Sequence, residues 1–341
     1  MRRTKLLLAG LAAAAALFSG CGKAGSGNAE RPLVIYTSLE SEQVNAYIGA
    51  FRKAHPEVRF NLVRDSTGIV TAKLLAEAAN PQADVIWGVQ CTSLLELESR
   101  GLFEPYAPAG VDKIRPEFKS PLPVPSWVGI HYVDTVIAVN PREAGRLNLP
   151  PVNSFDDLLR PEFKERVVAG NPGSSGIALM FVSGMLQSRG EQPGWNFLAR
   201  LNENVKLYAH SGSKPAKMVA MGEFPVGITS GYAAMQQQKK GAPIRLVFPA
   251  EGVPFDCEAN ALVRKPAIHP HAKLFLDWAI SDEAMKVYKT MNPLVTRTGD
   301  SGVYPDGSTP KLLPHDLART VRDRAAVIKQ WNDRFAGKSP R

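Results

Sequence analysis

The chain has 341 residues, 44% of them apolar, and carries 41 Lys and Arg against 32 Asp and Glu, a net charge of +9. The basic residues are dispersed rather than gathered into a stripe with interleaved aromatics, so the sequence indicates no nucleic-acid partner. The histidines are scattered and the cysteines lack zinc spacing. We therefore expect no metal site and no cofactor.

The first 20 residues have the form of an export signal, a lipoprotein signal peptide. Three basic residues precede an apolar run at residues 6–18, which is shorter than the roughly 20 residues that span a bilayer. Residues 18–21 then resemble the lipobox of bacterial lipoproteins, although Phe18 stands where that pattern prefers Leu. The resemblance implies that Cys21 is lipidated and becomes the mature N-terminus. The alternative is an ordinary secreted protein with a chance cysteine.

Residues 21–31 are predicted to be a lipidated tether, because Gly, Ser and Asn dominate this stretch. We expect a periplasmic or extracytoplasmic protein that is held on the membrane by its lipid anchor only. That compartment permits a disulfide between Cys91 and Cys257. The sequence does not show whether the two residues approach each other, and both could instead be small buried residues of the core.

About 320 residues follow the signal, enough for two lobes with well-buried cores. Without the three basic residues of the signal their net charge is near +6, a sign that favours anionic ligands through long-range attraction. Strand-length apolar runs alternate with helical patterns, which indicates an α/β protein with a mainly parallel sheet and helices on both faces. In the first set, the predicted strands are residues 33–36, 58–63 and 84–87. The predicted helices are 40–54, with Tyr47 and Phe51 on its apolar stripe, 69–79 and a segment through Leu94 and Leu97. The second set fills residues 154–248, with strands at 167–169, 205–210 and 226–228, and helices at 270–280, 281–291 and 312–335 follow it.

Two extended runs, at residues 127–140 and 260–263, connect the two sets and are predicted to be hinge strands. The chain is therefore expected to form a two-lobed clamshell. Its discontinuous first lobe is predicted to contain residues 32–133 and 256–341, and its second lobe residues 134–255. The ligand should bind in the cleft, at the carboxyl ends of the strands.

Hydroxyl and glycine residues stand where four of the strands are followed by helices. Free amides and the helix dipole favour an anion at such places, and hydroxyls add donors from other directions. Ser and Thr are also the ordinary N-cap residues, so any one site could be only a cap, but two such sites in each set favour contact with a ligand. The predicted ligand residues of this kind are Ser38, Ser66, Thr67, Ser174, Ser175 and Ser213.

Aromatic and acidic side chains near the same turns are predicted to complete the site. Trp87 ends a predicted strand, and Tyr232 follows a Thr-Ser-Gly turn, so both are expected to line the cleft. A cationic group on the ligand would require a carboxylate or an aromatic face. The acidic candidates are Glu40, Asp65, Asp256 and Glu258, and their spacing does not choose among them; Glu40 is included in the predicted site.

Several segments share a pattern beyond these turns: residues 34–40, 63–69, 81–88, 171–176, 210–215 and 222–228. Together they resemble the substrate-binding proteins of 2-aminoethylphosphonate importers, relatives of the ferric-iron-binding cluster, and the resemblance covers about residues 32–300. It implies a type II periplasmic-binding fold with two hinge-strand crossovers. Such a protein closes on a small anionic solute, here 2-aminoethylphosphonate or a related organophosphonate, and delivers it to an ABC permease and its ATPase. We expect it to act as a monomer.

The residues also bear on other ligands and on an enzymatic function. Ferric-binding relatives carry adjacent tyrosines, whereas residues 230–233 contain Tyr232 alone, which argues against direct iron ligation. Ferric iron, phosphate and a sugar phosphate remain the alternatives. The sequence contains no G-x-S-x-G elbow, P-loop or metal-spaced histidines, and no histidine partner for the serines is evident. It therefore favours a binding protein over an enzyme.

Overall fold

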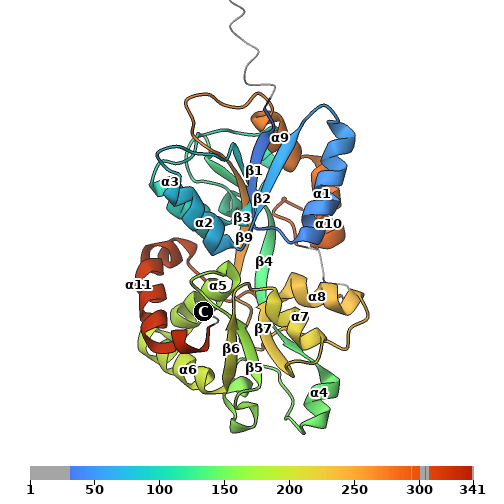
Figure 1. The fold of residues 1–341 in the computed structure, drawn as a ribbon, viewed down its shortest axis with the longest axis vertical. Coiled ribbons are helices and arrows are strands. Elements are labelled where there is room, and N and C mark those ends of the chain that lie inside the picture. Colours follow the sequence, from blue (N-terminus) through green and yellow to red (C-terminus); the bar gives the residue numbers. More distant parts are fainter. Residues whose placement is uncertain (1–30, 293, 300–303, 305–306, 340–341) are drawn as a thin grey trace, which may run out of the picture.

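The computed structural model describes residues 31–292, 294–299, 304 and 307–339. The predicted signal and Cys21 lie outside the described residues. The described chain forms two lobes stacked along the long axis of the molecule (Figure 1). The first lobe contains β1 (Leu33–Thr37), α1 (Ser41–Ala54), β2 (Phe60–Arg64), α2 (Thr67–Ala76), β3 (Val85–Gln90), α3 (Cys91–Ser99), α9 (Ala272–Ala279) and α10 (Asp282–Met291). The second contains α4 (Pro141–Arg146), β5 (Val167–Gly170), α5 (Gly176–Arg189), α6 (Glu191–Asn204), β6 (Val205–Ala209), α7 (Lys214–Ala220), β7 (Val226–Ser230), α8 (Gly231–Lys239), β8 (Arg245–Val247) and α11 (Leu317–Phe335).

Two of the described strands, β4 (Trp127–Val139) and β9 (Phe255–Leu262), connect the lobes. The first half of β4 pairs antiparallel with β9, and its second half pairs with β7 and β8 of the second lobe. Strand β9 also pairs with β3 of the first lobe. The sheet order is therefore β2-β1-β3-β9-β4-β7-β5-β6, with β8 beside β4. The predicted α/β two-lobed fold with two hinge strands is confirmed.

Each lobe has its own apolar core, built where helices cover both faces of the sheet. All six residues of β3 are buried, as expected for a strand that has helices on both sides. Helix α1 buries the predicted stripe that includes Tyr47 and Phe51. Phe51 packs edge-on against Phe275 of α9, with ring centroids 4.9 Å apart, so elements from both ends of the chain close the first core.

The C-terminal helix corrects one predicted domain boundary. Residues 256–341 were predicted to belong to the first lobe, but α11 buries Val327, Trp331 and Phe335 in the core of the second lobe. These residues recur every four positions and so form one apolar stripe, and the ring of Trp331 lies edge-on against Tyr208 of β6. Neither α11 nor any other described helix is long and apolar enough to cross a membrane.

A disulfide joins Cys91 and Cys257, a pairing that the sequence left open. Cys91 begins α3 and Cys257 lies in the hinge strand β9, and both are fully buried. The bond therefore ties the start of a helix in the first lobe to the hinge. Asp256 lies next to the two sulfur atoms, but bonded sulfurs do not offer the thiolates that a metal ion would need.

Replacing both cysteines with alanine should lower the free energy of unfolding by about 3–5 kcal/mol, because the bond closes a loop with a sequence separation of 166 and so restricts the unfolded chain. Urea unfolding measures this change. Wild-type protein unfolded with a reductant present should match the double alanine variant. Equal unfolding midpoints with and without reductant would show that the disulfide contributes no stability.

Candidate functional site

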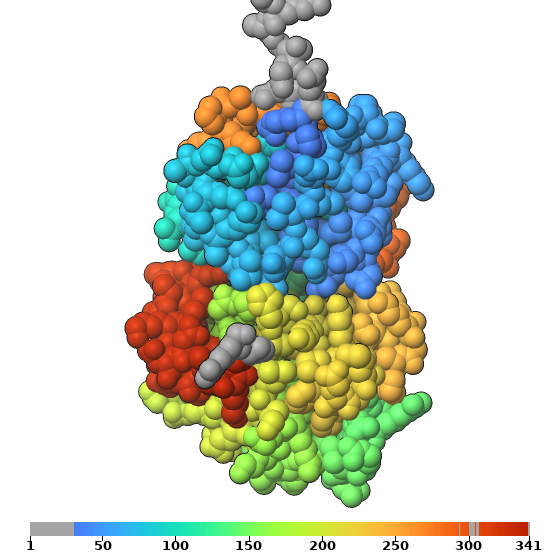
Figure 2. Space-filling model, in the orientation of Figure 1, coloured from blue at the N-terminus to red at the C-terminus, as the bar shows by residue number. Residues whose placement is uncertain are grey.

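A cavity of about 350 Å³ lies between the lobes beside the hinge strands. Its lining comes from the ends of β1, β2 and β3 in the first lobe and from the ends of β6 and β7 and the start of α5 in the second. The volume is near the lower end of the range for ligand pockets, about 300–1,000 Å³. In Figure 2 the surfaces of the two lobes meet along a seam across the middle of the molecule.

Six of the described helices begin at this cavity, and the N-cap residue of each lines it. Strands that run in the same direction end at one edge of their sheet, so the helices that follow them start close together. The amides of each first turn lack partners within the helix, and the helix dipole places positive potential there. The lining caps are Glu40 of α1, Ser66 of α2, Gln90 of α3, Ser175 of α5, Ser213 of α7 and Ser230 of α8.

Carboxylates already complement three of these helix starts. Glu40 is itself the cap of α1. Asp256 accepts hydrogen bonds from the amide and the hydroxyl of Thr92 at the start of α3, at 3.3 and 2.7 Å. Asp134 accepts from the amide of Gly231 at the start of α8. Burial raises the pKa of Asp134 and of Asp256 to about 6, so both are ionised at neutral pH and offset the positive end of their helix.

The starts of α2, α5 and α7 differ, because none of these three described helices has an acidic residue in its first turn. Helix α7 has Pro215 in its first turn and so offers one amide fewer than the other two. Ser66 caps α2 without using its hydroxyl in a capping hydrogen bond, whereas Ser175 accepts from an amide of α5. Asp65 precedes α2, but its carboxylate accepts from the amide of Ser66 and lies 3.6 Å from His210. The α2 and α5 starts are therefore the part of the cavity that best suits an anion.

The two lobes touch beside these helix starts. The amide of Gly68 in α2 donates to the carbonyl of Ser174 in the second lobe at 3.1 Å. Lys240, the residue that follows α8, forms an ion pair with Glu42 of α1 at 3.1 Å. Gly68 leaves no space at its contact, since a β-carbon there would lie 2.8 Å from two carbonyl oxygens of the second lobe. The structure is therefore a closed clamshell.

Most of the predicted ligand residues line the cavity, namely Ser38, Glu40, Ser66, Thr67, Ser175, Ser213 and Tyr232. Their contact with a ligand remains a prediction. Ser174 is outside the lining: its hydroxyl donates to the carbonyl of His210 at 2.6 Å, and its own carbonyl receives the amide of Gly68. Ser174 thus connects two loops and both lobes rather than facing the cavity.

The predicted placement of Trp87 in the cleft is wrong. Its side chain is fully buried in the core of the first lobe, where its indole nitrogen donates to the hydroxyl of Tyr288 at 3.2 Å. The strand was expected to end at Trp87, but β3 continues to Gln90. The residue that reaches the cleft edge is therefore Gln90, three positions further along the chain.

Several lining residues were missed by the sequence analysis, among them Gln43, Arg64, Gln90, His210 and Asn292. Arg64 ends β2 next to the predicted turn, and His210 ends a predicted strand, so both could have been found from the strand ends. Asn292 follows α10, far along the chain, and only the fold brings it to the cavity. Its amide nitrogen donates to the carbonyl of Tyr132 at 2.7 Å.

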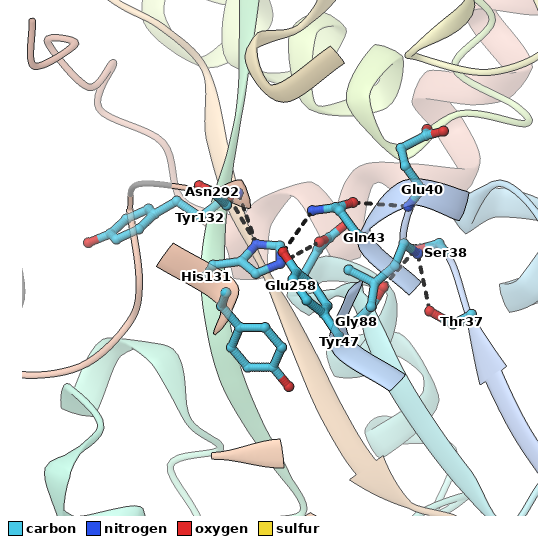
Figure 3. Close-up of polar contacts among 12 residues, drawn as sticks. Thr37, Ser38, Glu40, Gln43, Tyr47, Gly88, His131, Tyr132, Glu258 and Asn292 are labelled. Atoms are coloured by element: carbon cyan, nitrogen blue, oxygen red, sulfur yellow. Dashed lines mark hydrogen bonds and ion pairs between the residues drawn. The ribbon is translucent and has the colours of Figure 1, made fainter. Parts of the chain in front are cut away.

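Glu258 and His131 meet at the hinge end of the cavity (Figure 3). They are opposite each other in the β4–β9 pairing, and Nε2 of His131 lies 3.2 Å from Oε2 of Glu258. Burial raises the pKa of Glu258 well above its usual value and lowers the pKa of His131 to about 4. Burial thus disfavours the charged form of both groups. Although the distance is that of an ion pair, neither atom has a well-formed hydrogen bond to another described residue.

A clamshell of two α/β lobes, closed over a small polar cavity beside paired hinge strands, defines a solute-binding protein. Comparison with known proteins agrees, because residues 80–318 match the family of bacterial extracellular solute-binding proteins. The chain belongs to that family. It is therefore a binding protein and not an enzyme, as the sequence predicted.

Three known proteins show the extent of the similarity. An uncharacterized protein of Haemophilus influenzae is 30% identical over 331 residues, which cover 93% of this chain and 94% of that protein. A probable ABC transporter periplasmic-binding protein, y4fP of Sinorhizobium fredii, is 25% identical, with 75% of this chain and 71% of that one covered. The periplasmic binding protein AfuA of Actinobacillus pleuropneumoniae, solved with fructose-6-phosphate bound, superposes with a TM-score of 0.82 at 26% identity and covers 89% of this chain and 98% of its own.

The substitution Gly68→Ala should weaken ligand binding by preventing full closure, because the new β-carbon would meet fixed backbone of the second lobe. Stability should not fall, since alanine favours a helix over glycine by about 1 kcal/mol. Small-angle scattering with and without ligand, together with thermal unfolding, measures both effects. The matched control is Gly49→Ala in α1, where nothing lies within 4 Å of the added carbon. Normal closure and affinity in Gly68→Ala would contradict the role given to this contact.

Proposed function

We propose that the chain is the lipid-anchored, extracytoplasmic binding subunit of an ABC importer, and that its ligand is 2-aminoethylphosphonate or a closely related organophosphonate. Membership of the solute-binding family and the likeness to y4fP support the importer role. The lipobox-like segment that ends at Cys21 supports the anchor. The partners would be the permease and ATPase subunits, and the binding subunit would act as a monomer. An unmodified Cys21 in a mass spectrum of the membrane fraction would refute the anchor.

The observation that carries the choice of ligand is the meeting of α2 and α5 at the cavity with hydroxyls and no acid in their first turns. A phosphonate dianion presents three oxygens, each of which accepts hydrogen bonds. Ser66 and Thr67 approach from the first lobe, and the first-turn amides of α5 approach from the second. Helix-start amides and hydroxyls bind such an anion without a fixed positive charge.

The size and the far end of the cavity favour an organic phosphonate over inorganic phosphate. A tetrahedral anion occupies the space of only a few water molecules, each of which takes about 30 Å³ of liquid. The cavity of about 350 Å³ therefore has room for an organic group as well. Glu40, Glu258 and Tyr232 line the remainder, and carboxylates favour a cationic amine.

A sugar phosphate is the second candidate, favoured by the similarity to AfuA with its bound fructose-6-phosphate. The same helix starts would hold its phosphate group, and the acidic end would accept hydrogen bonds from sugar hydroxyls. Ferric iron is less consistent with the site. Tyr232 is the sole tyrosine among the described lining residues, and burial together with the nearby Glu42 raises its pKa, away from the phenolate that iron requires.

A ligand panel tests the proposal by calorimetry on the purified protein. We expect 2-aminoethylphosphonate to bind more tightly than ethylphosphonate, fructose 6-phosphate and inorganic phosphate. Tighter binding of fructose 6-phosphate would replace the phosphonate by a sugar phosphate. Stabilisation by ferric citrate with no response to any phosphonate would reject the anion site as a whole.

Two serine variants separate ligand contact from helix capping. Ser66→Ala should weaken phosphonate binding by about 10-fold or more, the scale of a hydrogen bond to a charged group. Its free energy of unfolding should change by less than about 0.5 kcal/mol, because the Ser66 hydroxyl makes no capping hydrogen bond. Ser281→Ala is the matched control: its hydroxyl caps α10 at 3.2 Å, so this variant should lose about 1 kcal/mol of stability and keep its affinity. Unchanged affinity in Ser66→Ala would remove the α2 start from the site.

A further inference from the structure

The cavity contains buried polar atoms that lack hydrogen-bonding partners among the described residues. They are Oε2 of Glu258, both amide atoms of Gln90 and the hydroxyl of Tyr232. Buried polar groups are nearly always paired, and leaving one unpaired costs about 1–3 kcal/mol. Three unpaired groups lining one cavity indicate that a ligand supplies their partners.

Glu258 has the most constrained position of the three. In β9 it pairs with Gln90 of β3 on one side and with His131 of β4 on the other. The neighbouring Cys257 is bonded to Cys91, the residue that follows Gln90. The backbone of Glu258 is therefore held by both hinge strands and by the disulfide, and its side chain, 10% exposed, lines the cavity.

The groups around the Glu258 carboxyl come from five elements. They are Asp256 of β9, His131 of β4, Glu40 and Tyr47 at α1, Arg64 of β2 and Tyr232 of α8. Burial, with Glu40 and Asp256 adding to it, raises the pKa of Glu258, and Arg64 only partly opposes them. Arg64 is itself paired with Glu40 at 3.0 Å. Among the described residues, the carboxyl therefore has no cation that is not already paired.

We propose that Glu258 is the specificity-determining residue of the site, which binds the ammonium group of the ligand as a carboxylate and gives up its proton when the ligand enters. This inference rests on the proposed aminophosphonate function and deepens it. The phosphonate lies at the α2 and α5 starts, and the amine reaches the hinge. His131 acts as a positioning residue, since its imidazole faces Oε2 of Glu258 from the opposite strand (Figure 3).

The proton balance gives this assignment a direct signature. The ligand keeps the three protons of its ammonium group, and the carboxyl proton of Glu258 passes to the buffer. About one proton is thus released for each bound amine. Because binding releases a proton, affinity for the amine ligand rises with pH until Glu258 is already ionised in the free protein. A ligand without an amine leaves the carboxyl protonated, and it releases only the proton that its own phosphonate group loses on binding as the dianion.

Calorimetry in buffers of different ionisation enthalpy measures the number of protons released. We would compare 2-aminoethylphosphonate with ethylphosphonate, which lacks the amine, on wild type and on Glu258→Gln. Glu258→Gln should weaken binding of the aminophosphonate by roughly 10- to 100-fold, abolish the additional proton release and leave ethylphosphonate affinity unchanged. The control is Glu57→Gln, which removes an exposed carboxylate paired with His55 outside the cavity and should behave as wild type.

Each outcome bears on one of the two proposals. Failure of both phosphonates to bind wild type would reject the proposed function. Binding of both, with Glu258→Gln weakening the two equally or leaving proton release unchanged, would reject the role of Glu258 and leave the function standing. If the variant does not fold, wild-type protein provides the test. The affinity for 2-aminoethylphosphonate divided by that for ethylphosphonate is measured across pH and corrected for the ionisation of each free ligand. A ratio that does not rise with pH would overturn the proposal.

Thermal unfolding of the unliganded protein adds an independent readout. The pKa of Glu258 in the folded protein lies above its unfolded value. Its contribution to the free energy of unfolding is therefore fully present below about pH 4.5 and is lost as the pH rises through the folded-state pKa. Glu258→Gln has no such loss. The unfolding midpoint of the variant relative to wild type should therefore increase from pH 4.5 to mildly alkaline pH. A difference in unfolding midpoint that stays constant with pH would show that Glu258 is already ionised in the unliganded protein. Glu258 would then have no proton to release on binding.

Discussion

The antiparallel pairing of β4 and β9 is the constraint on which the rest of the structure depends. These two strands carry both lobes: β9 adds to the sheet of the first lobe through β3, and β4 continues into the sheet of the second through β7. The cavity therefore lies beside the pair of described strands that the two lobes share. The disulfide between Cys91 and Cys257 adds a covalent constraint to the hinge, because it ties the start of α3 to β9.

Around this hinge, the distribution of carboxylates among the helix starts decides what the cavity can bind. Every helix start attracts an anion, but Glu40, Asp134 and Asp256 already meet that attraction at α1, α8 and α3. At α2 and α5 the first turns offer hydroxyls and amides, and a solute can take the place of the missing acid. At the other end, the buried Glu258 carboxyl has an oxygen without a hydrogen-bond partner among the described residues and suits a hydrogen-bond donor. The proposed ligand would place its anionic group at the helix starts and its cationic group at this carboxyl.

Local patterns predicted most of the framework because they report on interactions between near neighbours in the chain. The stripe through Tyr47 and Phe51 identified α1, and the alternation of strands with helices indicated the sheet. The hydroxyl-rich turns located most of the candidate site, since helix starts after parallel strands gather at one edge. The error at Trp87 arose from a strand end misplaced by three residues. Periodicity alone could not find that end, because a strand buried on both faces shows no alternation.

The placement of α11 shows a different limit, since its apolar stripe through Trp331 was visible in the sequence but its partner was not. An apolar stripe indicates that one face of a helix is buried, but it does not indicate which lobe buries that face. The same holds for the cysteines, whose pairing required β3 and β9 to be neighbours. It holds also for Asn292 and His131, whose side chains meet at the hinge only through the fold. By itself the sequence determined the class of fold, the order of its elements and the helix starts that suit an anion, because these depend on residues close together in the chain. Tertiary structure alone decided the disulfide, the lobe that holds α11 and the buried state of Glu258, because these depend on contacts between residues far apart in it.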